Sequence, residues 1–285
     1  MDLGIALSCV LSGLFMGGVY AMLAVPFNFQ IGALKVMNFS YGSLFMLGMY
    51  VVYACLMNGF SVWGLMAVIL PAFFVLGWLI RRYLVFTTDE NVQILLTMGI
   101  SILIENLVHT VFGAFPRTLG SIEEGTGILL GDTFVYVSLT RLYLAAGALA
   151  LLGVGYVFLQ KSWYGRCIRA LVQRPEMASV MGVNVRATAC VAFAASFCYL
   201  AVAAYFFMFF LSVEPHTGHN FLPMCFLIAV MGSIGNLLGS LCASFIIGVF
   251  SAFVAFFLPG YHDPIIFLMF IGVLLFRPNG LFGEA

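Results

Sequence analysis

Long apolar runs are the feature that most restricts what this chain can fold into. A helix needs about 20 predominantly apolar residues to cross the hydrocarbon core of a bilayer. Runs close to that length lie at residues 5–27, 62–80, 92–113, 139–159 and 187–210, and shorter or interrupted runs lie at 39–58, 221–234, 237–258 and 264–276. The sequence therefore predicts an all-α polytopic membrane protein with about eight or nine transmembrane helices, forming a single domain over residues 1–285.

Composition excludes several classes of protein. Of the 285 residues, 64% are hydrophobic and 8% are charged, whereas a soluble domain carries about a quarter charged residues. The net charge of zero argues against a nucleic-acid partner. The two lysines, Lys35 and Lys161, follow Leu34 and Gln160, so the chain lacks the G-K-[ST] sequence of a P-loop. We therefore expect neither ATP binding through a P-loop nor enzyme activity.

Basic residues predict the orientation of the chain in the membrane. Five of the eleven Lys and Arg residues lie between Lys161 and Arg186, and cytoplasmic segments are enriched in basic residues. With the N-terminus outside, only Arg117 and Arg141 fall on the outer side. The expected topology therefore has an outer N-terminus, a cytoplasmic C-terminus and a cytoplasmic loop 161–186.

A short helix is predicted inside that basic loop. Pro175 and Glu176 are typical of a helix start, and Gly182 is typical of a helix end. An apolar face precedes this helix and indicates that a cytoplasmic protein partner could cover it; its residues are Ile168, Leu171 and Val172.

Two apolar segments are interrupted by Gly, Asn and Ser, one in each half of the chain. They are Asn38–Gly42 and Gly232–Asn236. Broken helices in corresponding halves mark the midplane pathway of many transporters, because freed backbone groups are tolerated only beside protein or water. The interrupted segments are therefore candidate pathway segments, although the nearby G-x-x-x-G pairs Gly13/Gly17 and Gly235/Gly239 are also explained by helix packing alone.

A polar stripe follows the span at residues 92–113. Its members recur every four residues and are Gln93, Thr97, Ser101, Glu105 and His109. An acid in a membrane helix is costly unless it faces inward or is paired, and His109 is the expected partner of Glu105 one turn away. Two interpretations remain open: a buried pair that links helices, or a group that contacts the transported solute or relays protons.

The sequence gives little support for a metal site. His216 and His219 form an H-x-x-H pattern beside Glu214, but they lie on a turn rich in Pro and Gly, which favours an exposed connection. The seven cysteines show no C-x-x-C spacing. We expect no bound metal.

The order E-M-A-S-V-M-G from Glu176 to Gly182 resembles the E-A-A-x-x-x-G loop of ABC importer permeases, which docks on the ATPase subunit. The longer segment Tyr164–Val185 is similar to the same loop of the branched-chain amino acid permeases, a family that also contains urea and amide permeases. The resemblance implies an ATPase-coupling segment formed by Arg169, Pro175, Glu176, Ala178 and Gly182.

The resemblance extends over nearly the whole chain. Gly18–Gly42 is similar to a family segment that ends in N-F-A-H-G, Gly232–Gly239 to G-G-x-G-S-x-x-G, and Leu274–Gly283 to the family's C-terminal ending. Pro26 and Lys35 stand where the family usually has Gly. Together with the interrupted segments and the stripe, the resemblance implies a translocation pathway formed by Asn28, Asn38, Tyr41, Gly42, Gly232, Gly235, Asn236, Glu105 and His109.

The expected function is that of the permease subunit of an ABC importer for a small polar solute such as a branched-chain amino acid, in a bacterial inner membrane. The resemblance implies a second related permease, two ATPase subunits that bind the ATP and Mg²⁺, and an external solute-binding protein; this chain needs no cofactor itself. The loop at residues 114–138 is a candidate contact for the binding protein. Three alternatives stay open: a urea or amide permease, a proton-coupled carrier that uses Glu105 and His109, and a passive channel.

Overall fold

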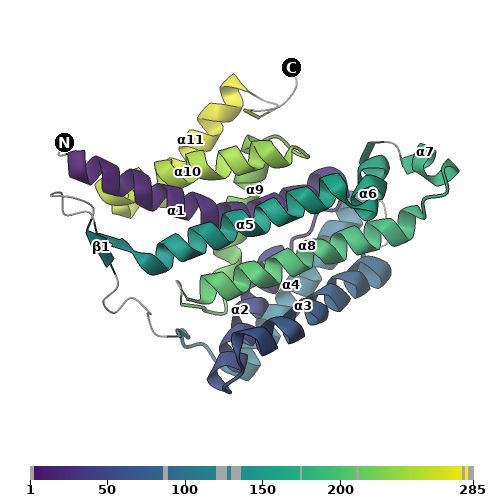
Figure 1. Ribbon diagram of the computed structural model, residues 1–285, viewed down its shortest axis with the longest axis horizontal. Helices are drawn as coiled ribbons and strands as arrows, with labels where there is room; N and C mark the ends of the chain where they lie inside the picture. Colours follow the sequence, from purple (N-terminus) through teal and green to yellow (C-terminus); the bar gives the residue numbers. More distant parts are fainter. Residues whose placement is uncertain are drawn as a thin grey trace. The chain divides into compact units, whose positions relative to one another are not determined.

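The computed structural model describes residues 3–85, 89–119, 127–129, 136–173, 175–209, 212–277 and 280–281. The chain forms two compact units whose helices are labelled in Figure 1. Unit 1 comprises Met1–Asn28, Gly120–Ala150 and Pro223–Ala285, and unit 2 comprises Phe29–Leu119 and Leu151–Leu222. The segments of the two units alternate along the chain, so the division does not separate two consecutive domains. Most of the loop at residues 114–138 lies outside the described residues.

Unit 1 is built on two long helices, α1 (Leu3–Asn28) and α10 (Leu237–Phe257), which pack along each other (Figure 1). Glycines allow this close approach. A Cβ atom at Gly17 would lie 2.8 Å from Cα of Phe245, and a Cβ at Gly13 would overlap Cα of Val249. The G-x-x-x-G pair of α1 is therefore a packing surface, and its glycine partner on α10 is Gly248.

The second G-x-x-x-G pair serves another purpose. Gly235 has a φ of 90° and lies in the turn before α10, and the backbone N–H of Gly239 donates to Oδ1 of the helix-capping residue Asn236.

Unit 1 also contains a two-stranded antiparallel ribbon, the first part of α5 and the last two helical segments; their bounds are β1 (Gly127–Leu129), β2 (Tyr136–Ser138), α5 (Leu139–Lys161), η3 (Pro259–Tyr261) and α11 (His262–Phe276).

Unit 2 is centred on α8 (Val185–Met208), which packs against α2 (Tyr41–Met57) and α3 (Val62–Leu79). Large side chains of α8 such as Phe193 and Phe197 are fully buried. Gly77 brings α3 close, because a Cβ there would lie 2.9 Å from the ring of Phe197. The remaining elements of unit 2 are η1 (Phe29–Ala33), η2 (Ile80–Leu84), α4 (Glu90–Phe112), the last part of α5, α6 (Trp163–Gln173), α7 (Pro175–Val180) and the first part of α9 (Thr217–Met231).

Among the described residues, six helical segments are long and apolar enough to cross a membrane, and three shorter apolar helices accompany them. This confirms the predicted class of helical polytopic membrane protein. The structure does not confirm the predicted count of eight or nine crossings: α2 and α9 are shorter than the six long segments, with 17 and 15 residues, and the third shorter segment is the described part of α5 from Ala150 to Lys161.

Both predicted interruptions are present. The chain leaves α1 after Pro26, which has no N–H for an intrahelical hydrogen bond, passes through the π-helix η1 and continues without regular structure to residue 38. In the second half, α9 ends at Met231 and α10 begins at Leu237.

Lys35, within the first interruption, has a φ of 50°, in the left-handed region that costs most side chains about 1 kcal/mol or more. This explains why glycine suits the position. We expect Lys35→Gly to raise the free energy of unfolding by about 1 kcal/mol in a detergent thermal-denaturation assay. Lys35→Ala removes the same exposed side chain but keeps a Cβ, so it should give no gain. Equal stabilisation by both variants would refute backbone strain as the cause.

The predicted short helix in the basic loop is present as α7, but two of the three residues of the apolar face before it are covered within the chain. Ile168 and Leu171 on α6 are buried, because α6 packs against α7 and α8 of the same chain. Arg169 on α6 also donates a hydrogen bond to the carbonyl of Leu159 near the end of α5. Val172 is exposed, and the most exposed apolar side chains among the described residues of the loop are Val180 and Met181, at the end of α7.

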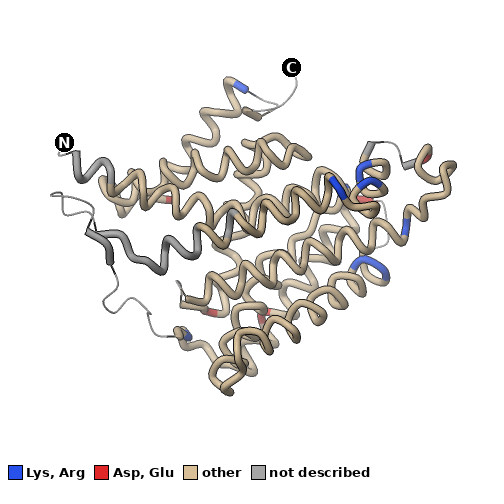
Figure 2. The backbone as a smooth tube through the Cα atoms, viewed as in Figure 1, with Lys and Arg blue, Asp and Glu red and all other residues tan. Residues whose placement is uncertain are grey.

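Most of the described Lys and Arg residues of unit 2, Lys35 and Arg117 excepted, lie near one end of its helices. Figure 2 shows blue segments on η2, on α6 and at the adjoining ends of α5 and α8, all at the right of the view. They are Arg81, Arg82, Lys161, Arg166, Arg169 and Arg186, whereas Arg174 lies outside the described residues. Helix ends far apart in the sequence therefore form one basic end of unit 2.

Candidate functional site

Asn28, at the end of α1, holds the interrupted segment 232–236 in place. Its side chain is fully buried, and its amide N–H groups face the carbonyls of Ser233 (3.1 Å) and Asn236 (3.2 Å) and the hydroxyl of Ser240. Its Oδ1 accepts a hydrogen bond of 2.9 Å from the backbone N–H of Gly235. One side chain thus satisfies backbone donors and acceptors that the broken helix leaves free.

The local sequence explains the shape of this segment. Ser233 and Gly235 both have positive φ, at 73° and 90°. Gly232 lies against α10, since a Cβ there would lie 2.5 Å from Cα of Ser240. The C-terminal segment also meets this region, because the N–H of Leu281 donates to the carbonyl of Met231 at 2.8 Å. We call the group formed by Asn28, Gly232, Ser233, Gly235, Asn236 and Ser240 the Asn28 site.

A second polar site lies in unit 2. The buried side chain of Gln30 donates to Ser196 Oγ (2.7 Å) and accepts from Asn38 Nδ2 (3.1 Å). Oδ1 of Asn38 in turn accepts from the hydroxyl (2.6 Å) and the backbone N–H (3.1 Å) of Ser40. We call Gln30, Asn38, Ser40 and Ser196 the Asn38 site.

The polar stripe of α4 supports the irregular segment beside this site. Gln93 and Thr97 are buried, and they accept hydrogen bonds from the backbone N–H groups of Met37 (3.2 Å) and Phe39 (3.1 Å). The first half of the stripe therefore satisfies unwound backbone, which supports a structural role for these two side chains.

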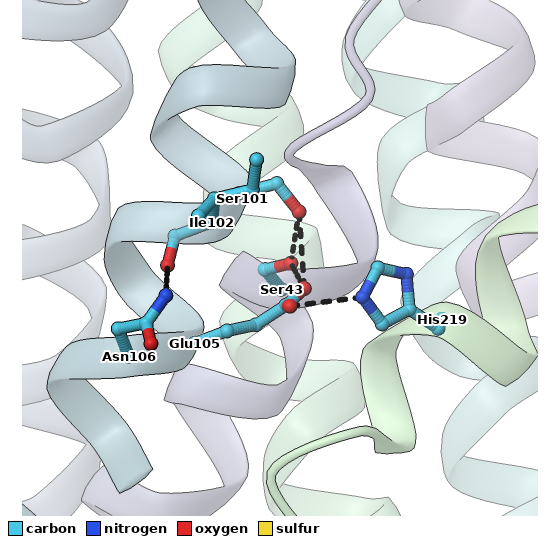
Figure 3. A network of polar contacts seen from close by, with 6 residues as sticks. All are labelled: Ser43, Ser101, Ile102, Glu105, Asn106 and His219. Atoms are coloured by element: carbon cyan, nitrogen blue, oxygen red, sulfur yellow. Dashed lines mark hydrogen bonds and ion pairs between the residues drawn. The ribbon is translucent and has the colours of Figure 1, made fainter. Parts of the chain in front are cut away.

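The second half of the stripe forms the Glu105 network shown in Figure 3. Oε1 of Glu105 accepts hydrogen bonds from the hydroxyls of Ser43 (2.7 Å) and Ser101 (3.1 Å). Oε2 lies 2.8 Å from Nε2 of His219 at the start of α9. The network thus joins α2, α4 and α9 through one carboxylate.

The predicted pairing of Glu105 with His109 is wrong, because His219 takes that place. Four residues advance a helix by about 400°, so each step of the stripe turns by about 40° around the axis. Gln93 and Thr97 are consequently buried, Glu105 is half-buried and His109 is exposed. Sequence spacing could not identify His219, which lies 114 positions from Glu105.

Tyr41 and Gly42, at the start of α2, are tightly enclosed. Tyr41 is 1% exposed. A Cβ atom at Gly42 would overlap the carbonyl oxygen of Gly218, and a Cβ at Gly218 would lie 2.5 Å from the carbonyl carbon of Gly42. Gly42 therefore brings the backbones of α2 and α9 together, and Gly218, which the sequence did not single out, is its partner.

The predicted coupling segment has the expected local structure. Pro175 begins α7 and Glu176 lies in its first turn, while Ala178 is buried. Gly182 has a φ of 82°, and the N–H of Val183 donates to the carbonyl of Ala178 at 3.0 Å. This is the Schellman arrangement that ends helices at a left-handed glycine.

The chain matches the family model described as "Branched-chain amino acid transport system / permease component" over residues 9–276. The chain belongs to this family. The Asn28 site, the Asn38 site, the Glu105 network and α7 all lie within the matched residues. The family consists of transport permeases, which are not catalytic in the sense of an enzyme.

The chain is also similar in sequence to individual curated permeases along nearly its whole length. The chain is 28% identical to the "High-affinity branched-chain amino acid transport system permease protein LivH" of Salmonella typhimurium, over 96% of this chain and 94% of that protein. It is 27% identical to the corresponding protein BraD of Pseudomonas aeruginosa, over 96% and 95%. A probable branched-chain amino acid transport permease of Methanocaldococcus jannaschii is 25% identical, over 92% and 88%. No solved structure shows significant similarity.

Sequence reasoning about this permease missed several residues that complete the sites. Gln30 had a detectable signal, since an amide in a long apolar run needs a partner. Ser43, Ser196 and Ser240 had none, because serine is common in helices that pack closely in membranes. Their roles depend on tertiary contacts with residues 62, 166 and 212 positions away.

Proposed function

We propose that this chain is the membrane-spanning permease subunit of an ATP-driven importer in an inner membrane, and that its solute is a small amino acid of the branched-chain class. The observation that carries the proposal is the family match over residues 9–276. The named relatives, which act in branched-chain amino acid transport, support the solute class. ATP and Mg²⁺ would be bound by separate ATPase subunits, and a second permease and an external binding protein would complete the importer.

The Asn28 and Asn38 sites are the proposed supports of the translocation pathway. Both lie where helices are interrupted, and both hold unwound backbone with buried amides and hydroxyls. Such segments leave carbonyl and N–H groups near the midplane that a polar solute can use. Rearranging a few side-chain hydrogen bonds would expose these groups without unfolding a full helix.

The proposed ATPase-docking surface is the exposed end of α7. Val180 and Met181 are 82% and 84% exposed, at the end of a helix that packs against α6 and α8 (Figure 1). We expect Val180→Asp to abolish most co-purification with the ATPase subunits and to reduce solute uptake at least tenfold, because a desolvated charge disrupts an apolar interface. Phe115→Asp, at another strongly exposed apolar residue near the opposite end of unit 2, is the matched control. Normal ATPase association and uptake for Val180→Asp would contradict this surface, and absence of any ATPase partner for the parent would contradict the importer.

The proposed orientation has the basic end of unit 2 in the cytoplasm, as the positive-inside rule favours. In a background without native cysteines, a cysteine at Val180 should react with an impermeant maleimide only in inverted vesicles. A cysteine at Phe115 should react in intact cells. The reverse pattern would establish the opposite topology.

A further inference from the structure

Two histidines at the start of α9 lie close to Glu105. His216 and His219 are exposed and lie on one turn, with their rings nearly parallel at 25° and their centroids 6.3 Å apart. The ligand atoms that these histidines and Glu105 can offer all lie within 4.8 Å of one another. The acid that completes the H-x-x-H pattern is thus Glu105, on α4, rather than the neighbouring Glu214.

The carboxylate of Glu105 is oriented before any ligand arrives. The hydroxyls of Ser43 and Ser101 both donate to Oε1, so Oε2 is the oxygen turned toward His219 (Figure 3). Hydrogen bonds of this kind orient carboxylates that bind metals. The carboxylate is also half-buried, which limits the positions that it can take.

The histidine turn is fixed as well. The N–H of His219 donates to the carbonyl of His216 at 3.0 Å, and the hydroxyl of Thr217 accepts from the N–H of Glu214 at 2.8 Å. Gly218 lies directly against Gly42, so the turn is held on α2 by backbone contact. The two imidazoles therefore start from fixed Cα positions but retain the side-chain rotation that solvent exposure allows.

We propose that Glu105, His216 and His219 form a binding site for one divalent transition-metal ion of the zinc class. Two imidazole nitrogens and one carboxylate oxygen are a donor set that suits Zn²⁺ and not Mg²⁺ or Ca²⁺, which prefer oxygen ligands. Three protein ligands leave a fourth position for water or a solute.

The required adjustment is small. Ligands bound at 2.0–2.2 Å in tetrahedral geometry are about 3.3 Å apart. The Glu105–His219 contact of 2.8 Å would lengthen by about 0.5 Å. His216 would turn toward the same point by side-chain rotation. The bound ion would replace the direct Glu105–His219 hydrogen bond as the link between α4 and the start of α9.

Titration of the purified full-length chain with Co²⁺, whose tetrahedral complexes absorb visible light, tests this site directly. We expect one equivalent of Co²⁺ to bind and Zn²⁺ to displace it. His216→Gln and His219→Gln should each weaken binding about tenfold or more, as should Ser43→Ala, which removes a group that orients the carboxylate. His109→Gln changes an exposed histidine one turn beyond Glu105 and should bind like the parent. Absence of a stoichiometric ion in the parent, or binding as tight as the parent's by both His216→Gln and His219→Gln, would overturn the site.

A measurement on the parent alone covers the case in which a variant is unstable. Zn²⁺ should protect His216 and His219 from modification by diethylpyrocarbonate, while His109 remains reactive. Equal modification of all three with and without Zn²⁺ would also overturn the proposal. Neither readout involves solute uptake, so the metal site and the proposed importer function can fail separately.

Discussion

Asn28→Leu is expected to lower the free energy of unfolding by about 3 kcal/mol and to abolish transport. The change removes the acceptor of the Gly235 N–H and the amide that faces two carbonyls. Ser240 still donates to the Asn236 carbonyl, so the largest loss is the partly buried hydrogen bond of the Gly235 N–H, a donor that costs about 1–3 kcal/mol when it is left buried and unpaired. Loss of the fixed shape of segment 232–236 adds to that cost.

Thermal unfolding of detergent-purified protein, together with uptake in reconstituted vesicles, checks this prediction. Asn106→Leu is the matched control, because Asn106 is exposed on α4 and bonds only within its own helix, to the carbonyl of Ile102. The control should be neutral or stabilising in an apolar environment. Parent-like stability of Asn28→Leu would show that the Asn28 site does not depend on its amide.

Gly42→Ala is the second substitution with a large expected effect. The added methyl group would overlap the Gly218 carbonyl, and backbone atoms cannot turn aside as a flexible side chain can. We expect a loss of about 3 kcal/mol or more, because α2 and the start of α9 must separate. That separation would also draw His219 away from Glu105.

Gly99→Ala provides the comparison on α4. A Cβ at Gly99 meets no atom within 4 Å, so alanine there should stabilise the helix by up to about 1 kcal/mol. Both variants are measured by the same unfolding assay and by the yield of folded protein. Similar stability and folded yield for Gly42→Ala and Gly99→Ala would mean that the contact between the backbones of Gly42 and Gly218 relaxes easily.

The features that could be predicted from the sequence are those determined by residues close together in the chain. Apolar runs identified the long helices, and Asn38–Gly42 and Gly232–Asn236 marked the interruptions because Gly, Asn and Ser break an apolar helix. The start and left-handed end of α7 followed from Pro175, Glu176 and Gly182. Each of these signals depends on residues only a few positions apart.

Features that depend on tertiary contact escaped prediction. Ile168 and Leu171 have the spacing of a docking face, but they are buried in the chain, where α6 packs against α7 and α8. Periodicity does not distinguish a face covered by the same chain from one covered by a partner. The partner of Glu105 was misplaced for a related reason. A helix offers a residue one turn away in every sequence, whereas a partner from another helix depends on how the helices pack.

The bonds of Asn28 have an evolutionary consequence. Apart from Ser240 Oγ, all its partners are backbone atoms, and the side chain of Ile234 in the middle of the segment is 49% exposed. Mutations at position 234 therefore leave the contacts of Asn28 intact, and no compensating change at position 28 is needed. The side chain that holds the segment thus lies 205 residues before it, at a position that should show covariation with position 240 and not with position 234.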